Sequence, residues 1–358
     1  MRLSSRVIQR LPKTDIHCHL DGCLRPRTVL ELAAAQGVKL PTLKLPALTR
    51  VLQAGKRTRN LGDYLKIFDI TLSVMQERDA LYRVAYELAE DAAAENIKHL
   101  EVRFAPILHL KKKLKYEQIV DAVVDGLRDS GNKNGLTTGV IICGIRSMDP
   151  RTSMELAELA VAYKGRGVLA FDLAGQEQDY PAKAHREAFA LILKNNVNST
   201  VHAGEAFGPA SIAQALHYCG AHRIGHGTRL REDPDLMRYV NDHRIPLEMC
   251  LSSNVQTRAA KSLKEHPFGY YFKHGVRVTL NTDSRLISAT TVSDEVALAA
   301  RTFRLGPYDV KRILINGFKS SFLPYAQKAR LLRQVNVEID QVFMDEFPDD
   351  YDRRAVNM

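Results

Sequence analysis

Two histidines near the N-terminus are the first residues in this sequence whose types and spacing could support chemistry. His17 and His19 lie two residues apart, at the end of a short apolar run that begins at Thr14. If this run is a β-strand, residues i and i+2 point to the same face, so the two imidazoles converge on one point. Two neutral imidazoles on one rigid element are half of a zinc or other transition-metal site. A histidine pair alone is weak evidence, so the prediction depends on ligands found later in the chain.

Later stretches of the sequence supply the missing groups. His202 offers a third imidazole, Glu205 follows it after a flexible glycine, His226 stands between two glycines, and Asp283 ends the last predicted strand. The two early histidines, with His202 and Asp283, provide three imidazoles and one carboxylate without a thiolate. This set suits zinc with an open position for water.

The same residues suggest metal-assisted hydrolysis. Bound zinc lowers the pKa of its water to about 7, which makes hydroxide available at neutral pH. If Glu205 is desolvated, its carboxyl has a raised pKa and could donate a proton. His226 could orient the hydroxide from beside the metal.

Each of these residues also has a purely structural interpretation. His226 could be a satisfied core or surface histidine, Asp283 could cap the following helix, and Glu205 could pair with an arginine. Their joint occurrence at the ends of separate predicted strands favours a shared site. Cys18 points to the opposite face of its strand, where we expect it to pack in the barrel.

The elements that must position these groups alternate along the chain. Short β-branched or apolar runs predict strands at residues 14–20, 99–105, 138–145, 168–174, 200–203, 223–226, 246–251 and 277–282. Helical spacing of apolar residues lies between most of them, for example at 117–129, 154–163 and 183–194. Eight strands alternating with helices favour a closed parallel (β/α)8 TIM barrel over an open sheet. In such barrels the carboxyl ends of the strands carry the catalytic groups, and strand eight closes beside strand one.

Two regions extend the barrel pattern. A helical insertion over residues 24–97 follows the first strand, and within it Leu61, Tyr64, Leu65 and Phe68 have the spacing i, i+3, i+4, i+7. This spacing predicts either a helix packed on the core or a lid over a substrate. Three helices are predicted after Asp283, at 294–304, 307–318 and 324–346; we expect the first to be the eighth barrel helix and the others to be extra C-terminal helices. Residues 1–358 are predicted to form one domain.

Composition restricts the classes of partner and compartment. The chain has 358 residues, 45% of them hydrophobic and 26% charged, which is typical of a globular protein with a sizeable core. The net charge of +10 is spread along the sequence, and the densest run, Lys111-Lys112-Lys113, is typical of a solvated helix start. We therefore expect no nucleic-acid partner. The sequence lacks a signal-peptide core and an apolar run of about 20 residues, and its five cysteines form no framework. These features favour reduced thiols, no membrane association and a cytoplasmic location.

In combination, the motifs resemble the adenosine deaminase family of the amidohydrolase superfamily. The resemblance extends from about residue 13 to the C-terminal helices. Its motifs are His17-x-His19-Leu20-Asp21-Gly22, Leu173-Ala174-Gly175, His202-Ala203-Gly204-Glu205, Arg223-Ile224-Gly225-His226-Gly227, Ser252-Ser253-Asn254 and Asn281-Thr282-Asp283. The resemblance implies a (β/α)8 barrel with one zinc ion per subunit and a small purine nucleoside as substrate. It leaves the oligomeric state open.

The resemblance also implies a role for each matching residue. The zinc ligands would be His17, His19, His202 and Asp283. Glu205 would protonate N1 of a 6-aminopurine, His226 would position the hydroxide that attacks C6, and Asp283 could accept a proton from that hydroxide. Asp21 would hydrogen-bond the ribose 5′-hydroxyl, and Gly175 would offer its backbone N–H to purine N3. The apolar lid would consist of Leu61, Tyr64, Leu65 and Phe68.

One position departs from the family pattern. Where the family has a second aspartate that donates a hydrogen bond to purine N7, this chain has Ser284, followed by Arg285. The expected reaction is hydrolysis of adenosine and 2′-deoxyadenosine to the inosines and ammonia. The substitution also suggests a modified adenosine such as aminodeoxyfutalosine, because these two residues could face a larger or anionic 5′ group. Adenine deaminases usually have glutamate at the Asp21 position, which makes free adenine a weaker alternative. A non-catalytic zinc-binding protein has no need of Glu205 or His226.

Overall fold

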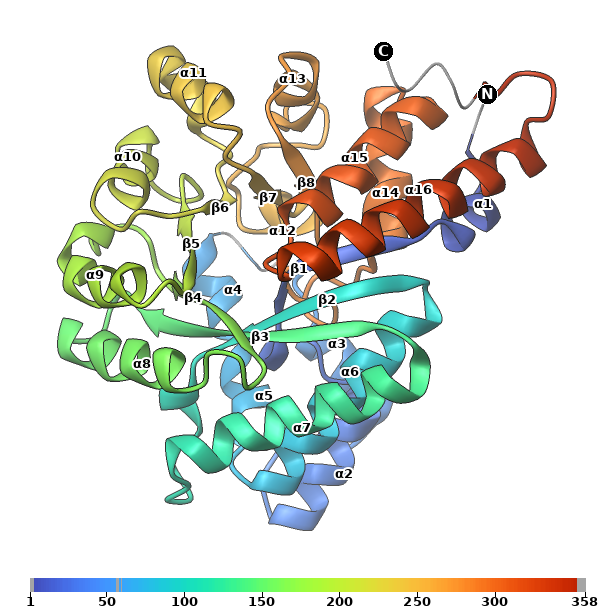
Figure 1. Cartoon of the computed structure of the whole chain (residues 1–358). Coiled ribbons are helices and arrows are strands. Elements are labelled where there is room, and N and C mark those ends of the chain that lie inside the picture. The colour runs from blue at the N-terminus through green and yellow to red at the C-terminus, as the bar shows by residue number, and fades with distance from the viewer. Residues whose placement is uncertain (1–2, 56–57, 59, 353–358) are drawn as a thin grey trace.

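A parallel barrel forms the centre of the molecule, as Figure 1 shows for the computed structural model, which describes residues 3–55, 58 and 60–352. Within these residues, eight strands run in the order β1 to β8, and every neighbouring pair is parallel. The strands are β1 (Lys13–His19), β2 (Ile97–Phe104), β3 (Thr137–Ile145), β4 (Val168–Ala174), β5 (Asn198–Ala203), β6 (Arg223–His226), β7 (Leu247–Met249) and β8 (Val278–Leu280).

The barrel closes at the residues that follow β8. The backbone N–H of His19 donates to the carbonyl of Asp283 at 2.7 Å, and the N–H of Asp283 donates to the carbonyl of His17 at 2.9 Å. This pairing brings the end of the eighth strand beside the first, as the (β/α)8 prediction requires. The fold class predicted from alternation is confirmed.

All eight predicted strands are present, and their ends differ by a few residues. The predicted strands 246–251 and 277–282 shorten to β7 and β8, because Leu251 already begins a helix and Asn281 and Thr282 lie beyond the ladder. The strands are buried on both faces, between the barrel interior and the surrounding helices, so they appear in sequence as apolar runs.

Helices surround the strands (Figure 1). The helices before β5 are α1 (Ser5–Arg10), α2 (Pro26–Gln36), α3 (Leu45–Leu52), α4 (Leu61–Leu65), α5 (Phe68–Ser73), α6 (Arg78–Ala94), α7 (Tyr116–Asn134), α8 (Pro150–Ala162) and α9 (Arg186–Lys194). Those after β5 are α10 (Pro209–His217), α11 (Pro234–Asp242), α12 (Leu251–Gln256), α13 (Phe268–Lys273), α14 (Val292–Phe303), α15 (Pro307–Ser320) and α16 (Tyr325–Glu346). Short 3-10 turns occur at η1 (Leu20–Gly22), η2 (Pro106–His109), η3 (Ala182–His185) and η4 (Leu230–Glu232).

The helix that covers the barrel closure is α15 and not the preceding helix. We expected the helix at 294–304 to take this place, but α15 packs more extensively than α14 along both β8 and β1. A Cβ added at Gly317 of α15 would lie 2.2 Å from the Thr14 hydroxyl oxygen, so the missing side chain lets the helix approach β1 closely. The prediction for the eighth barrel helix was wrong, because apolar spacing shows that a helix has a buried face but does not show which strands it covers.

The insertion after β1 contains the predicted lid segment in two pieces. The apolar spacing over residues 61–68 predicts one continuous helix, but α4 ends at Leu65 and α5 begins at Phe68. Asn60 caps α4 by accepting a hydrogen bond from the N–H of Asp63 at 2.9 Å. Tyr64 of α4 and Phe68 of α5 are both buried and pack with Ile287 in a small apolar cluster. The segment packs on the core, as one interpretation predicts, and it also borders the cavity described below; its role as a lid stays a prediction.

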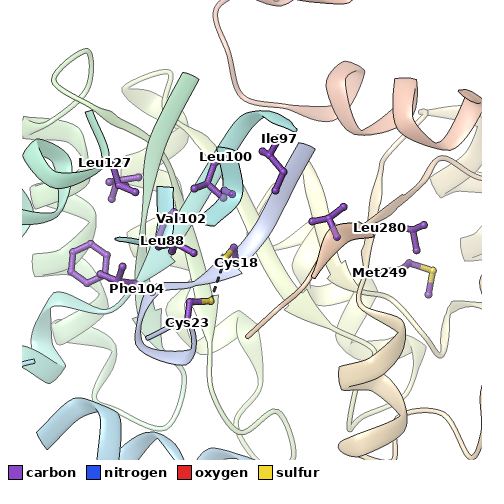
Figure 2. Close-up of a cluster of buried hydrophobic side chains, with 14 of the residues drawn as sticks. Cys18, Cys23, Leu88, Ile97, Leu100, Val102, Phe104, Leu127, Met249 and Leu280 are labelled. Atoms are coloured by element: carbon purple, nitrogen blue, oxygen red, sulfur yellow. Dashed lines mark hydrogen bonds between the residues drawn. The ribbon is translucent and has the colours of Figure 1, made fainter. Parts of the chain in front are cut away.

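The main apolar core lies around the barrel (Figure 2). Cys18 belongs to it, with its Sγ 3.4 Å from that of Cys23, which confirms the predicted packing of Cys18 on the outer face of β1. All five cysteines are free and buried. Across the described segments, the search for a helix long and apolar enough to cross a bilayer finds none.

Candidate active site

The histidines and Asp283 predicted from separate motifs meet at the carboxyl end of the barrel. Nε2 of His19 lies 3.1 Å from Nε2 of His202. One oxygen of Asp283 lies 3.4 Å from Nε2 of His17 and 3.4 Å from Nε2 of His19. A fifth group, His226, belongs to a set with His17, His202 and Asp283 whose ligand atoms all lie within 4.8 Å of one another. Geometry alone thus leaves both His19 and His226 near the centre.

The chemistry of these donors fits a metal ion. Nδ1 of His17 lies 2.8 Å from Glu248, and Nδ1 of His202 lies 3.1 Å from Asp172. A carboxylate at Nδ1 holds the proton there, which leaves each Nε2 with a lone pair facing the centre. Among the described residues, no hydrogen bond of good geometry reaches the buried Nε2 of His17. Burial, aided by the charge of Arg103, lowers the pKa of His17 to about 4, so the ring is neutral and able to coordinate.

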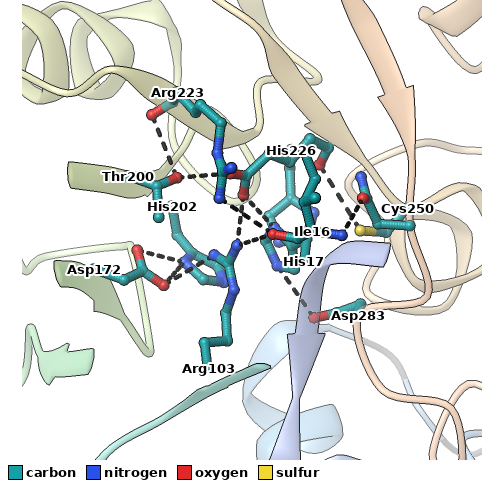
Figure 3. A network of polar contacts seen from close by, with 12 residues as sticks. Ile16, His17, Arg103, Asp172, Thr200, His202, Arg223, His226, Cys250 and Asp283 are labelled. Atoms are coloured by element: carbon teal, nitrogen blue, oxygen red, sulfur yellow. Dashed lines mark hydrogen bonds and ion pairs between the residues drawn. The ribbon is translucent and has the colours of Figure 1, made fainter. Parts of the chain in front are cut away.

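A buried ionic network holds the carboxylates that orient the histidines (Figure 3). Arg103 of β2 contacts Asp172 of β4 at 3.0 Å and Glu248 of β7 at 2.8 Å. Arg223 of β6 pairs with the same Glu248 and with Glu101. Burial alone would raise the pKa of Asp172, but the neighbouring His202 and Arg103 outweigh it and hold that pKa well below its usual range. The network therefore keeps the carboxylates behind the histidines charged.

Glu205 and His226 contact each other beside this centre and could act as an acid–base pair. Oε2 of Glu205 lies 3.5 Å from Nε2 of His226, and both side chains are buried. Burial raises the pKa of Glu205 and so favours the protonated form of its carboxyl. Glu205 makes no ion pair with an arginine within the described ranges, so the alternative of a simple arginine salt bridge is wrong.

The backbone at two of these residues is unusual. His226 and Asp283 have φ values of 63° and 61°, in the left-handed region that non-glycine residues seldom adopt. Such strained backbone conformations persist only where the surrounding structure holds them, and they cluster at functional sites. The alternative that Asp283 caps the following helix is wrong, because the Thr291 side chain caps that helix, α14.

Gly225 makes room within the site itself. A Cβ at this position would lie 3.1 Å from Cε1 of His17 and 3.1 Å from Cα of His202. Gly225, one of the two glycines that flank His226, therefore packs against the site's own histidines. Its small size serves the convergence of the imidazoles.

Glu177, which sequence reasoning missed, holds the loop that carries Glu205. Its carboxylate accepts hydrogen bonds from four consecutive backbone N–H groups, those of Gly204, Glu205, Ala206 and Phe207. Glu177 follows the Leu173-Ala174-Gly175 motif by two residues, and this position after a strand end was the only available signal. Since Glu177 is 4% exposed, its contacts are shielded from water.

A cavity of about 380 Å³ opens onto the acid–base pair and the histidines. Its lining includes the predicted substrate residues Asp21, Gly175, Leu61, Tyr64, Leu65 and Phe68. Asp21 has one carboxyl oxygen without a hydrogen-bond partner among the described residues, and burial raises its pKa to about 7. The volume suits a small organic ligand.

Two predicted specificity residues lie elsewhere than expected. Ser284 is fully buried next to the Tyr64 phenol and is not among the residues that line the cavity. Arg285 pairs with Glu95 beside α14, on the outside of the barrel. The idea that Arg285 faces an anionic 5′ group of the substrate is therefore wrong, because buried acidic residues on the other side of the strand attract its guanidinium.

The fold and the site together define a class of protein. Imidazoles and a carboxylate converge at the carboxyl ends of the strands of a closed parallel barrel, with a glutamate and a histidine beside them. This combination is typical of metal-dependent hydrolases of the barrel type.

Comparison with known proteins identifies the family. A family model described as adenosine deaminase matches residues 12–338. Adenosine deaminase of Mycobacterium sp. (strain JLS) is 43% identical over 349 residues, which cover 93% of this chain and 96% of the relative. A longer protein of Dictyostelium discoideum, named "Probable adenosine deaminase", is 38% identical over 328 residues, or 92% of this chain and 42% of that protein. The crystal structure of Arabidopsis N6-mAMP deaminase has a TM-score of 0.83 at 27% identity, with 94% of this chain and 99% of that chain covered. The chain belongs to the adenosine deaminase family, whose members are hydrolytic deaminases acting on C–N bonds.

Proposed function

We propose that this protein hydrolyses adenosine and 2′-deoxyadenosine at C6 with one bound zinc ion, consuming water and releasing ammonia and the corresponding inosine. The observation that carries the proposal is the Glu205–His226 pair, which borders both the converging imidazoles and the cavity. Zinc would be held by His17, His19, His202 and Asp283, a set of nitrogen and oxygen donors without thiolate. When bound, it would supply a water with a pKa of about 7 and thus a nucleophile at neutral pH.

The protein's own residues manage the protons. Glu205, with its raised pKa, would donate a proton to purine N1 and so make C6 electrophilic. His226 would orient the incoming oxygen through Nε2. Asp283, whose second oxygen accepts a hydrogen bond from Ser253 at 2.6 Å, would accept the proton that the nucleophile gives up. The carbon–oxygen bond forms at C6, the carbon–nitrogen bond breaks, and the amino group leaves with the transferred proton as ammonia.

The cavity walls would position the nucleoside. Asp21 would hydrogen-bond the ribose 5′-hydroxyl, and the Gly175 N–H would meet purine N3. The lid residues would cover the sugar and exclude water. Ser284, whose buried hydroxyl has no hydrogen-bond partner among the described residues, would donate to purine N7.

The cavity lining favours an uncharged nucleoside. Among the described residues, its lining contains no lysine or arginine. A 5′-phosphate or a carboxylated 5′ substituent would therefore meet no lysine or arginine from the described part of this lining, and burying an unpaired charge is costly. This argues for adenosine over a nucleotide or aminodeoxyfutalosine.

A direct assay tests the proposal. Purified protein of measured metal content is incubated separately with adenosine, 2′-deoxyadenosine, adenine, AMP and aminodeoxyfutalosine, and the ultraviolet change from 6-amino- to 6-oxopurine is followed. We expect fast turnover of the first two substrates and removal of activity by a chelator, with recovery on addition of zinc. If adenosine is untouched while a 5′-substituted nucleoside turns over, the substrate assignment is wrong and the hydrolytic chemistry remains.

A further inference from the structure

A series of three buried hydrogen bonds leads from the backbone of α13 to the catalytic His226. The N–H of Phe268 lies 3.1 Å from Nδ1 of His266. Nε2 of His266 lies 3.1 Å from Oδ1 of Asn254, and Nδ2 of Asn254 lies 3.0 Å from Nδ1 of His226. His266, Asn254 and His226 are 3%, 0% and 1% exposed, so water cannot replace any of these contacts.

The direction of the series is set by its first donor. A backbone N–H only donates, so Nδ1 of His266 must accept and carries no proton. A neutral imidazole has one proton, which therefore lies on Nε2 and is donated to Asn254 Oδ1. This requirement turns the amide so that its NH2 faces His226, and Nδ1 of His226 must accept in turn.

The opposite orientation of the Asn254 amide is excluded by the donors and acceptors available. If the Asn254 amide were flipped, its NH2 would face Nε2 of His266, and both ring nitrogens of that residue would have to accept. Only an imidazolate could do so. A doubly protonated His266 would set Nδ1–H against the Phe268 N–H, and burial lowers the pKa of His266 to about 3. The orientation of the Asn254 amide therefore follows from the backbone N–H of Phe268.

We infer that Asn254 and His266 are positioning residues that fix His226 as the neutral tautomer with its proton on Nε2. In this form His226 presents an N–H toward Glu205 and the attacking oxygen. It cannot be a metal ligand through Nε2, because that nitrogen has no free lone pair. Of the two imidazoles left near the centre by distance alone, His19 therefore completes the ligand set. The catalytic part of this inference rests on the proposed function, whereas the tautomer itself does not.

The tautomer is measured directly by NMR. In zinc-loaded protein labelled with 15N-histidine, the two-bond 1H–15N correlations distinguish a protonated ring nitrogen from an unprotonated one. The His226 signals are identified by their absence from the His226→Gln protein. We expect Nε2 protonated and Nδ1 unprotonated; the opposite pattern, or a zinc-coordinated Nε2, overturns the inference. This readout stands even if adenosine is not the substrate, so its failure and that of the proposed function are distinguishable.

Asn254→Asp is the sharpest variant. An aspartate of nearly the same shape offers only acceptors, so Nδ1 of His226 must donate and its proton moves from Nε2. We expect the reversed NMR pattern and a loss of kcat of about 10²- to 10⁴-fold, as seen when a triad histidine takes the wrong tautomer, with KM changing much less. Wild-type kcat together with a reversed tautomer contradicts the catalytic part of the inference.

Substitutions at His266 provide an independent test if Asn254→Asp does not fold. His266→Leu removes the donor to Asn254, whereas His266→Gln retains an N–H that can reach it. We expect a greater loss of kcat in the leucine variant and partial recovery in the glutamine variant. The exposed His274→Gln, at the residue that follows α13, serves as a matched control with unchanged kcat. Equal losses in both His266 variants indicate a purely structural role and contradict the inference.

Discussion

At the residue scale, each catalytic group depends on a partner that determines its protonation or its position. Asp172 and Glu248 hold the Nδ1 protons of His202 and His17, and burial raises the pKa of Glu205. The carboxyl of Glu205 is thus prepared to donate while the imidazoles are prepared to coordinate. Two substitutions test the proposed proton donor and the loop that carries it.

Glu205→Gln removes the proton donor without touching a proposed ligand. We expect kcat to fall by about 10²- to 10⁴-fold, because a carboxamide cannot protonate purine N1. Elemental analysis should find the same metal content as in the wild type. Glu232→Gln, on the exposed η4 turn, is the control and should keep its activity. A Glu205→Gln protein of near-normal activity would remove this residue from its proposed role.

Glu177→Gln tests the support of the loop that carries Glu205. A glutamine has one acceptor oxygen, and its NH2 group would face backbone N–H groups that now donate to a carboxylate. We expect kcat to fall by about 10²-fold through misplacement of Glu205, with bound metal retained. The exposed Glu187→Gln is the matched control. An unchanged kcat shows that the loop holds its position without Glu177.

At the element scale, short helices carry residues that contact and hold the side chains of the site. The helix α12 carries Ser253 and Asn254, which contact Asp283 and His226. Glu295 of α14 accepts a hydrogen bond from the Ser252 N–H of α12 at 3.3 Å and so joins the two helices. The lid helix α4 is tied to the loop after β8 by Tyr64, whose hydroxyl lies 2.8 Å from that of Ser288.

Tyr64→Phe should loosen the lid. One neutral hydrogen bond contributes about 0.5–1.5 kcal/mol, so we expect KM to rise by about two- to tenfold with kcat little changed. Ser288→Ala removes the same bond and should have the same effect. Steady-state kinetics of the double variant should show no further rise. Additive effects contradict a shared role for this hydrogen bond in closing the lid.

Glu295→Gln should change how stability depends on pH. Burial raises the pKa of Glu295 to about 7, against about 4.3 in an unfolded chain. The protonated form therefore stabilises the fold fully below about pH 4.3, and this contribution is lost as pH rises through about 7. By urea unfolding at pH 5 and pH 8, we expect the variant to gain up to about 3 kcal/mol relative to the wild type at the higher pH. An equal difference at both values contradicts the raised pKa.

At the scale of the whole molecule, buried charges join opposite strands through the barrel. Arg103 of β2 reaches Asp172 of β4, Glu248 of β7 and the carbonyl of Ile16 in β1 (Figure 3). The same carboxylates orient two imidazoles, so the stability of the barrel and the geometry of the site depend on one network. The apolar core around the barrel then surrounds a polar interior held by buried ion pairs.

Arg103→Met should be strongly destabilising. It leaves the buried Asp172 without its arginine and Glu248 with Arg223 alone, and breaking a buried pair in this way costs about 3–5 kcal/mol. Urea unfolding of the metal-free protein measures the loss. Arg10→Met removes an arginine from the half-exposed pair with Asp345 and should cost less than about 1 kcal/mol. Similar losses in the two variants contradict the importance of the buried network.

The sequence by itself determined the features that depend on local spacing. Alternation of apolar runs and helical patterns predicted the barrel, and two-residue spacing placed His17 and His19 on one face. The motifs at strand ends identified Glu205, His226 and Asp283, because a parallel barrel gathers such ends regardless of their separation in the chain. These inferences needed only the periodicity of strands and helices.

Only the tertiary structure decided which partners each residue meets. It showed that Glu177 holds the Glu205 loop, that Arg285 turns to Glu95, and that α15 covers the barrel closure. It also joined Asn254 and His266 to His226. Such contacts depend on side-chain direction and on chain segments brought together by folding, and no local pattern encodes either. Sequence periodicity therefore places the proposed catalytic groups at one end of the barrel, whereas packing in three dimensions determines their protonation and orientation.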